Sequence, residues 1–483
     1  MADMNDYLAV VAIDFGTTYS GFAYAFNHQK YRAGQQGIHM NSTWGNCRGV
    51  STLQTPTCIL LNPDKSFHSF GYRAQAKYIE LEEEQDRQYY YFDRFKMKLH
   101  QCEEIDSRTE ITASNGKKVN ALEVFAHAIR YLSEEATKLI SSRSGKSFTK
   151  KDMLWVITVP AIWNHVSKQF MREASYEAGI ISKNNPCQLV IALEPEAASL
   201  DCRERNMAEF VDKSDDNGKC GDVVSKPGTS YMVVDNGGRN PTKNNIMISK
   251  GCLCLGPDIM KSLFFPPLKK INDYLNRLLK ERSLQDVKSI FLVGGFSENA
   301  LLQNQIKRNF GSRYRILTPI DAGLSVMKGA VLFGLNRDSI KTRISPYTYG
   351  SDLSPIFNPK KHEEKYKFTL CGVERINVFN TLVTINENVK IGEVRTFIAY
   401  PTHDDQTSVH FGFYTTTQKQ VKYVDEPHVK KVGCVTLPIP DITKGRNRKL
   451  ELKVEFGRTE IKATTRDVKS GNVRTIYLDF MND

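Results

Sequence analysis

The feature that most constrains the fold is a turn that occurs twice in the chain. Its first copy lies within residues 8–26, which read as an apolar strand, a tight turn and a second strand. The turn begins with Asp14, at the end of the first strand, and continues with Gly16, Thr17 and Thr18. Glycine lets the backbone approach a ligand closely, and hydroxyls beside main-chain N–H groups can hold phosphate oxygens. No GxxxxGK[ST] motif is present, so this is not a Walker A loop.

The second copy follows at residues 230–238, where an apolar strand ends in Asp235 and continues into Gly237 and Gly238. A third turn, within residues 289–297, also follows an apolar strand and leads into a helical pattern. Each turn by itself has a simpler explanation, a connection that needs glycine only because it is tight. Two similar turns, separated by the length of a domain, predict instead two related lobes that face one nucleotide across a cleft.

A carboxylate lies between these two copies at the end of another apolar strand. Residues 188–193 form that strand, and Glu194 is followed by Pro195 at the expected start of a helix. Such a carboxylate is well placed to hold a metal-bound water. Acidic residues are also common in the first turn of a helix because they stabilise its dipole, so the position alone does not decide between the two roles.

Composition excludes several classes of protein. With 483 residues, 40% hydrophobic and 25% charged, the chain has the composition of a globular protein of several domains. No apolar run approaches the length of a membrane span, and the N-terminus lacks the pattern of a secretory signal. The ten cysteines form no CxxC pair, which favours reduced thiols. The net charge of +12 is spread in proportion to length, so we expect no nucleic-acid partner and a cytoplasmic protein, with the nucleus as an alternative.

The last 140 or so residues change character. Short runs of alternating apolar and polar residues, separated by turn residues, replace the mixture of helical and strand patterns. This alternation predicts an antiparallel β-sandwich. The boundary falls near residues 336–345.

The motifs, in their order along the chain, resemble those of the 70 kDa heat-shock chaperones of the actin and sugar-kinase superfamily. They read DFGTTYSG, VPAIWN, LEPEAA, VVDNGG, LVGGFSE and DAGLSVMKGAVLFGL, followed by the β-rich part. Within that family the chain looks most like the divergent heat shock 70 kDa protein 12 branch, which has segments similar to FDRFKMKLH, SPYTYG and FGRTEIKAT. The resemblance covers nearly the whole chain.

The resemblance implies an α/β fold with an actin-like (ribonuclease H-like) two-lobe ATPase part and a C-terminal all-β, sandwich-like domain. The first lobe would comprise residues 1–227, and a shortened second lobe residues 228–342. A β-rich, substrate-binding-like domain would comprise residues 343–483. The cofactors implied are ATP or ADP with Mg²⁺.

The resemblance also implies catalytic roles for three residues. Lys96 looks like the lysine that reaches the γ-phosphate and the attacking water, and Glu194 resembles the catalytic glutamate. Asp235 resembles the aspartate that helps to organise the waters of Mg²⁺, and the metal would be held through water by Asp14 and Asp235. The positions that resemble nucleotide-binding ones are Asp14, Gly16, Thr17, Thr18 and Tyr19 in the first phosphate turn, Gly237 and Gly238 in the second, and Gly294 and Gly295 in the adenosine turn.

Two departures from the family pattern bear on activity. Where the family continues the second phosphate turn with a glycine, a threonine and an aspartate, this chain has residues 239–242 with the sequence RNPT. The loss of one well-placed electrostatic group can reduce turnover by roughly a hundred- to a thousand-fold. Asp235 and Gly294 are also closer in sequence than in the family, which implies an internal deletion that removes the helical subdomain around adenine. Glu298 replaces an arginine that stacks near adenine in ordinary members.

Three hypotheses follow. The first is a chaperone-like ATP-binding protein with slow or impaired hydrolysis, which acts in the stress response with unfolded or extended polypeptide and co-chaperones as partners. The second is a non-enzymatic adaptor or regulatory scaffold that retains the fold with a degenerate nucleotide site. The third, a small-molecule kinase of the same superfamily, needs a substrate-side catalytic aspartate and a sugar pocket, for which the sequence offers no signal.

Overall fold

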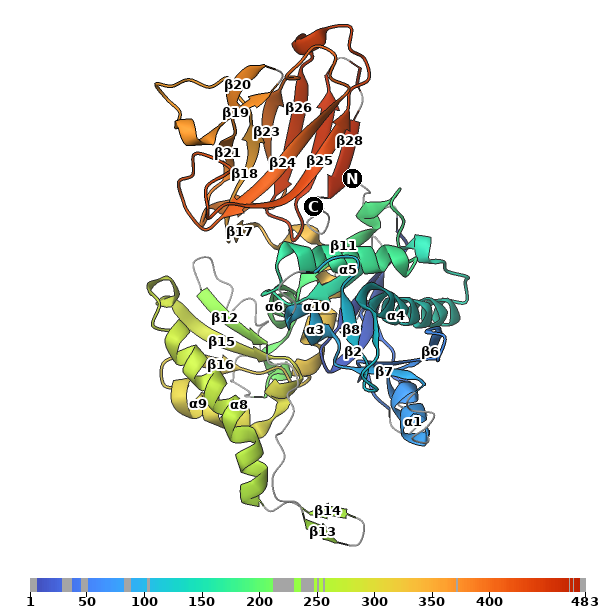
Figure 1. Cartoon of the computed structure of the whole chain (residues 1–483). Coiled ribbons are helices and arrows are strands. Elements are labelled where there is room, and N and C mark those ends of the chain that lie inside the picture. Colours follow the sequence, from blue (N-terminus) through green and yellow to red (C-terminus); the bar gives the residue numbers. More distant parts are fainter. Residues whose placement is uncertain are drawn as a thin grey trace. The chain divides into compact units, whose positions relative to one another are not determined.

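A computed structural model of the chain is shown in Figure 1. Two compact units make up the structure. Unit 1 comprises Met1–Cys102, Glu110–Ile162 and Ala174–Arg337, and unit 2 comprises Glu103–Thr109, Trp163–Glu173 and Asp338–Asp483. The structure describes residues 7–27, 37–44, 51–81, 88–101, 105–211, 230–235, 247–249, 252–254, 257–370, 372–468, 470–471 and 473–477.

The larger sheet of unit 1 has the strand order β11-β10-β1-β2-β3, and β4 pairs with β2 beside this path. β1 runs parallel to β10 and antiparallel to β2, and β10 runs parallel to β11. Every residue of β1 and β10 is buried, which is why both strands read as continuous apolar runs and not as alternating ones. The strands are β1 (Ala9–Phe15), β2 (Tyr19–Phe26), β3 (His39–Met40), β4 (Thr55–Pro56), β10 (Met153–Val159) and β11 (Leu189–Leu193).

Further strands and helices form within residues 58–204, and α5 among them is divided between the two units. The longest helix, α4, begins after Asn120, whose side chain accepts the N–H groups of Leu122 and Glu123 as an N-cap, and it ends at Gly145 in the left-handed conformation. The strands are β5 (Cys58–Leu61), β6 (Phe67–Phe70), β7 (Tyr90–Asp93), β8 (Glu110–Thr112) and β9 (Lys118–Asn120), and the helices are α1 (Tyr72–Glu80), α3 (Lys96–Gln101), α4 (Ala121–Ser144), α5 (His165–Glu177) and α6 (Glu194–Glu204).

A second sheet of unit 1 consists of three parallel strands in the order β12-β15-β16. One face of its central strand carries Ile290 and Leu292 into a core with Leu275 and Ile306, which come from two helices. The opposite face packs against a different core, which includes Ala198 of α6. The elements are β12 (Ser230–Asp235), β13 (Met247–Ser249), β14 (Cys252–Cys254), α8 (Pro257–Leu278), β15 (Val287–Val293), α9 (Ala300–Phe310), β16 (Arg315–Leu317) and α10 (Ser325–Leu335).

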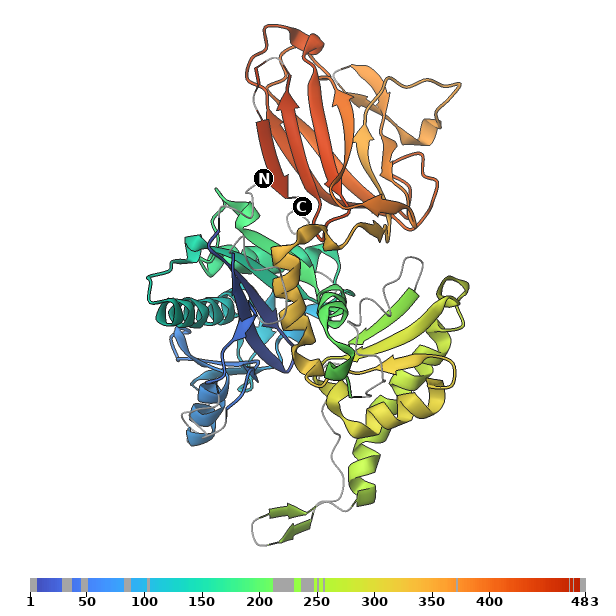
Figure 2. The same ribbon diagram turned by 180° about the vertical axis from the view of Figure 1, so that it is seen from behind.

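Helices α6 and α10 join the two sheets of unit 1. At Gly329 of α10 the helices are so close that a Cβ would collide with the carbonyl oxygen of Ala197 in α6. At Gly334 a Cβ would lie 2.5 Å from Val10 and 2.8 Å from Val156, in the two central strands of the larger sheet. Figure 2 shows the golden helix α10 against the dark-blue strands of that sheet. The two glycines therefore allow a close approach that any larger residue would prevent.

Unit 2 contains two four-stranded antiparallel sheets, β21-β18-β24-β25 and β23-β26-β27-β28. Their inner residues form one hydrophobic core, which includes Phe411, Leu437, Leu452 and Val454. The strands are β17 (Thr342–Ile344), β18 (Thr348–Leu353), β19 (Lys367–Leu370), β20 (Val373–Ile376), β21 (Val378–Val383), β22 (Asn388–Lys390), β23 (Glu393–Ala399), β24 (Ser408–Thr416), β25 (Lys430–Pro438), β26 (Leu450–Phe456), β27 (Lys462–Asp467) and β28 (Val473–Tyr477).

The prediction of a mixed α/β chain with a β-rich C-terminal part is confirmed. The actin-like character of the two lobes, and the domain boundaries 1–227, 228–342 and 343–483, stay predictions. Among the described residues, no helix combines the length and the apolar character needed to cross a membrane.

Candidate functional site

Asp14 occupies the end of β1, where the parallel neighbour β10 also ends. Its side chain is 7% exposed. The hydroxyl of Thr158, on β10, donates a hydrogen bond of 2.8 Å to Oδ1, and Nε2 of Gln54 lies 3.5 Å from Oδ2 as a weak donor. The residue that sequence reasoning placed in the first phosphate turn is thus a buried carboxylate that accepts from two neutral donors in the described part of the chain.

The turn after Asp14 is tight, and Thr57, which lies outside it in the sequence, stabilises it by hydrogen bonds. A Cβ on Gly16 would collide with the carbonyl oxygen of Tyr19, so the turn requires glycine at this position. The hydroxyl of Thr57 donates to the carbonyl oxygen of Gly16 at 2.8 Å, and its backbone N–H donates to the carbonyl oxygen of Thr18 at 2.8 Å. Thr17 and Thr18 are partly exposed, and Tyr19 is exposed. The geometry agrees with a ligand-facing turn, and the phosphate-binding role of these residues stays a prediction.

Lys96 and Glu194, which sequence reasoning proposed as catalytic, meet in the structure. The Nζ atom of Lys96 lies 2.6 Å from Oε1 of Glu194, and the two side chains are 2% and 15% exposed. Lys96 is the first residue of α3 and Glu194 the first residue of α6, so two helix starts that are distant in sequence place the pair. A buried lysine needs such a partner, because an unpaired charge away from water is very costly.

Asp235 ends β12 and faces the same group of charges. Loss of water around the carboxylate and the negative charges of Glu194 and Asp14 raise its pKa, whereas Lys96 lowers it. Because Asp235 is exposed at the end of the strand, the negative charges of Glu194 and Asp14 explain the raised pKa better than burial does. Gly237 and Gly238, the predicted second phosphate turn, lie outside the described residues, as do residues 239–242.

The site carries an excess of negative charge. Burial raises the pKa of Asp14 to about 6, and the charge of Glu194 adds to this, while Lys96 and the hydrogen bond from Thr158 act in the opposite direction. Three carboxylates thus share one lysine, an arrangement that favours the binding of a cation. Among the described side chains, no group of three or more His, Cys, Asp or Glu residues could hold a metal ion directly.

The raised pKa of Asp14 gives a prediction for stability against pH. Because the folded protein holds this proton more tightly than the unfolded chain, Asp14 contributes stability that is full below about pH 4 and is lost as the pH rises through about 6. The difference amounts to at most about 3 kcal/mol. We therefore expect Asp14→Asn to raise the melting temperature at pH 8 and to leave it nearly unchanged at pH 4. Equal shifts at both pH values, measured by calorimetry, would contradict this.

The predicted adenosine turn has a backbone conformation and an open space that favour its two glycines. Gly294 has a φ of 83°, which favours glycine, and its N–H donates to the carbonyl oxygen of Ala322 at 2.9 Å. Around Gly295 the space is open, since no other atom would lie within 4 Å of a Cβ there. Glu298 accepts the N–H of Gly323 at 2.8 Å, so the residue that departs from the family pattern holds the neighbouring turn in place.

One site residue that sequence reasoning missed is Gln54. Its Nε2 atom lies 3.5 Å from Oδ2 of Asp14 and 3.4 Å from the carbonyl oxygen of Gly323. These are long hydrogen bonds, but they place one side chain between Asp14 and Gly323, whose N–H donates to Glu298 just after the adenosine turn. Thr158 was missed as well. Neither residue stands in a motif, so no local signal in the sequence indicates it.

A buried ionic network was also missed. Arg205, directly after α6, is 2% exposed and its Nε atom donates to Oδ2 of Asp201 at 2.8 Å. Its Nη1 atom lies 2.5 Å from Oδ1 of Asp321, and Nζ of Lys328 lies 2.5 Å from the other oxygen of Asp321. Asp321 precedes the residues that hold the adenosine turn. The network therefore connects the C-terminal end of α6, which begins with Glu194, to that turn.

The similarity to known proteins extends over the whole chain. No family model matches it. It is 32% identical to Heat shock 70 kDa protein 12A of Homo sapiens, over 100% of this chain and 93% of the relative, and 32% identical to the protein of that name in Mus musculus over the same shares. It is 29% identical to Heat shock 70 kDa protein 12B of Homo sapiens over 99% and 92%. The first alignment extends over 632 positions although the chain has 483 residues, so that relative contains sequence that this chain lacks.

Proposed function

Because the chain belongs to the 70 kDa heat-shock protein family, in its 12A/12B branch, we propose that it is a chaperone-like protein that binds ATP with Mg²⁺ and hydrolyses it slowly or not at all. The observation that carries this proposal is the group of Asp14, Lys96, Glu194 and Asp235. A buried lysine–glutamate pair lies beside two carboxylates whose pKa values are raised, which fits a site that a hydrated cation and phosphates complete.

In the proposed mechanism each residue has one task. Bound Mg²⁺ would supply positive charge to the phosphates during transfer to water. Asp14 and Asp235 would accept hydrogen bonds from waters of that ion, and Lys96 would stabilise the negative charge on the transferred phosphoryl group through its ammonium. Glu194 would orient the attacking water and accept its proton on a carboxylate oxygen.

Slow turnover is part of the proposal for two reasons. Lys96 and Glu194 contact each other at 2.6 Å, so the charges meant for the phosphate and the water neutralise one another before a substrate arrives. Residues 239–242 lack the threonine and aspartate with which the family continues its second phosphate turn. Each lost electrostatic group is expected to cost roughly a hundred- to a thousand-fold in rate.

The deciding experiment is calorimetric titration of the full chain with ATP and Mg²⁺, with ADP as the second ligand. We expect binding of both nucleotides, and at least a tenfold loss of affinity for the Mg²⁺ complexes in Asp14→Ala, because the variant removes a carboxylate that faces the ion. Thr43→Ala, at an exposed position outside the predicted phosphate and adenosine turns, serves as the control. Absence of binding by a protein shown to be folded would reject the proposal.

Absence of binding would favour the second candidate, a non-enzymatic adaptor or regulatory scaffold. Two observations support that candidate: the altered second turn, and the sequence that this chain lacks relative to Heat shock 70 kDa protein 12A. The fold would then serve to present surfaces, and the charges around Lys96 would be a remnant of the nucleotide site. A cytoplasmic location is part of both proposals.

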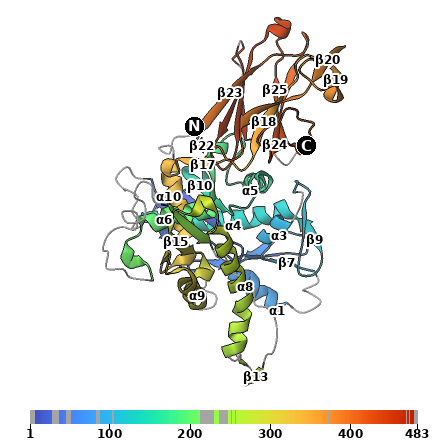
Figure 3. The same ribbon diagram turned by 90° about the vertical axis from the view of Figure 1, so that its left-hand side faces the viewer.

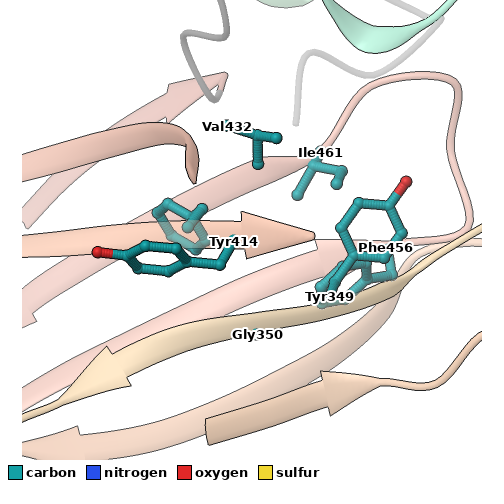
Figure 4. Close-up of a pocket in the computed structure, with 7 residues that line it drawn as sticks. Tyr349, Gly350, Tyr414, Val432, Phe456 and Ile461 are labelled. Atoms are coloured by element: carbon teal, nitrogen blue, oxygen red, sulfur yellow. The ribbon is translucent and has the colours of Figure 1, made fainter. Parts of the chain in front are cut away.

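Extended polypeptide is the proposed partner of the β-rich unit. An apolar depression in unit 2 lies among Tyr349, Tyr414, Phe456 and Ile461, which Figure 4 shows around one small space. As it stands the space does not admit a water-sized molecule. Binding of an apolar peptide side chain there would therefore require these aromatic rings to move apart.

A further inference from the structure

Thr57 lies directly between two short strands that belong to different sheets of unit 1. Strand β4 ends at Pro56 and pairs with β2, where Pro56 lies opposite Tyr19 at the end of the predicted first phosphate turn. Strand β5 begins at Cys58 and pairs with β7, where Cys58 lies opposite Asp93. Figure 3 shows β7 next to the helix α3, which follows it in the chain. Thr57 therefore lies between the elements that carry two predicted parts of the nucleotide site.

Thr57 contacts the predicted first phosphate turn through its hydroxyl and its N–H group. The residue is 2% exposed, and its hydroxyl donates a hydrogen bond of 2.8 Å to the carbonyl oxygen of Gly16. Because that hydroxyl has one proton to donate, the hydroxyl of Ser20 is the donor in the second contact, at 2.7 Å. The N–H of Thr57 donates to the carbonyl oxygen of Thr18 at 2.8 Å. One buried residue thus holds the backbone of the turn at Gly16 and Thr18, and a side chain at its far end.

The carbonyl oxygen of Thr57 contacts a second turn, the one that precedes Lys96. It accepts the N–H of Arg94 at 3.1 Å. Arg94 has a φ of 46°, a left-handed conformation that is unfavourable for residues other than glycine and that persists only with support from its surroundings. Arg94 connects β7 to α3, whose first residue is Lys96. The same residue thus holds the phosphate turn and the strained turn that leads to Lys96.

We propose that Thr57 is a positioning residue, which fixes the first phosphate turn relative to the ammonium of Lys96. The proposal rests on the proposed function, in which that turn holds a phosphate and Lys96 stabilises its negative charge. Because Thr57 is buried and bonded to the turn, it acts through Gly16 and Thr18 and not by contact with the nucleotide. Misplacement of a reacting group by about 1 Å can cost roughly a hundred-fold in rate, so the distance that Thr57 sets bears directly on turnover.

Thr57 also determines which backbone groups of the turn are available to an anion. A carbonyl oxygen carries partial negative charge, so one that pointed at a phosphate would repel it, whereas N–H groups and hydroxyls attract it. The two carbonyl oxygens that Thr57 engages are those of Gly16 and Thr18. Held in these hydrogen bonds, both oxygens stay directed at Thr57, which leaves the N–H groups of the turn to face the ligand.

The first test compares ATP hydrolysis by the full chain and by two variants. Thr57→Val keeps the branched shape without the hydroxyl, and Thr57→Ser keeps the hydroxyl. We expect Thr57→Val to lower kcat at least about tenfold with a smaller change in KM, and Thr57→Ser to remain within about threefold of the wild type. Thr348→Val is the matched control, because Thr348 is a buried residue of unit 2 whose hydroxyl donates to the carbonyl oxygen of Gln418 and accepts the N–H of Ile385. The control should lower the melting temperature and leave kcat unchanged.

The second test needs no nucleotide and follows the turn itself. In hydrogen exchange resolved to single residues, the amides of Thr57 and Arg94 should be protected in the wild type, since both are hydrogen-bonded. We expect protection of the amide at position 57 to fall at least about tenfold in Thr57→Val, because its acceptor on Thr18 is no longer held, and to be retained in Thr57→Ser. The amide of Arg94 should stay protected in both variants, because the carbonyl group at position 57 is unchanged.

The two tests separate failure of this proposal from failure of the proposed function. If the wild type hydrolyses ATP, a kcat of Thr57→Val within about threefold of the wild type would overturn the proposal. An equal loss of kcat in Thr57→Ser would do so too, because the hydroxyl would then not be what positions the turn. If the wild type does not hydrolyse ATP, hydrogen exchange alone decides, and unchanged protection of the amide at position 57 in Thr57→Val would overturn the proposal. Absence of ATP binding as well would reject the proposed function.

Discussion

Replacing Lys96 by methionine is expected to lower the rate of ATP hydrolysis roughly a hundred- to a thousand-fold relative to the wild type. Among the described residues, the ammonium of Lys96 is the positive charge that acts on Asp14, Glu194 and Asp235, and methionine keeps roughly the length and volume of the side chain without the charge. We expect the loss in kcat at saturating nucleotide, because the interaction of the Lys96 ammonium with the phosphoryl group strengthens as negative charge develops in the transition state. Phosphate release under single-turnover conditions measures it.

The same substitution should also lower stability, which allows the two effects to be separated. Lys96→Met leaves Glu194, 15% exposed, without its partner, and breaking a buried pair by removing one member costs about 3 to 5 kcal/mol. The double variant Lys96→Met with Glu194→Gln removes both charges and should regain most of the stability while remaining inactive. Turnover of the single variant within about threefold of the wild type would refute the catalytic role.

Replacing Arg205 by leucine is expected to lower the free energy of unfolding by about 3 to 5 kcal/mol at pH 8. Arg205 is the buried cation between Asp201, which is fully buried, and Asp321. Burial raises the pKa of Asp201 to about 6 even though the charge of Arg205 acts in the opposite direction. Without Arg205 the carboxylate of Asp201 has lost its nearest cation, and its folded-state pKa rises further.

The pH dependence distinguishes this electrostatic effect from simple loss of packing. A raised folded-state pKa gives stability at low pH that is lost as the pH rises, so the cost of Arg205→Leu should be small near pH 4 and large at pH 8. The double variant Asp201→Asn with Arg205→Leu should recover much of the loss at pH 8. Thermal unfolding of the wild type, Arg205→Leu, Asp201→Asn and the double variant at both pH values measures this, and an equal cost of Arg205→Leu at pH 4 and pH 8 would contradict the explanation.

Local features of the site follow closely from the sequence. Gly16 and Gly294 were singled out because glycine permits tight turns, and the structure shows a close contact at the first and a positive φ at the second. Lys96 and Glu194 were proposed from resemblance, and the structure brings them together. Gln54, Thr158 and Arg205 had no such signal, because their partners lie on other elements and no motif connects them in sequence.

What the sequence by itself determined is the set of local preferences: apolar strands that end in Asp and Gly, a helix that begins near Glu194, and alternating strands after a boundary near residues 336–345. These follow from backbone sterics and from the periodicity of side chains, which act over a few residues. Only the tertiary structure decided that α6 and α10 meet at Gly329, that Arg205 connects α6 with Asp321, and that β12 pairs with β15. Those outcomes depend on how elements that are distant in sequence pack against each other. The free energy of such packing depends on both partners, so a short stretch of sequence does not reveal it.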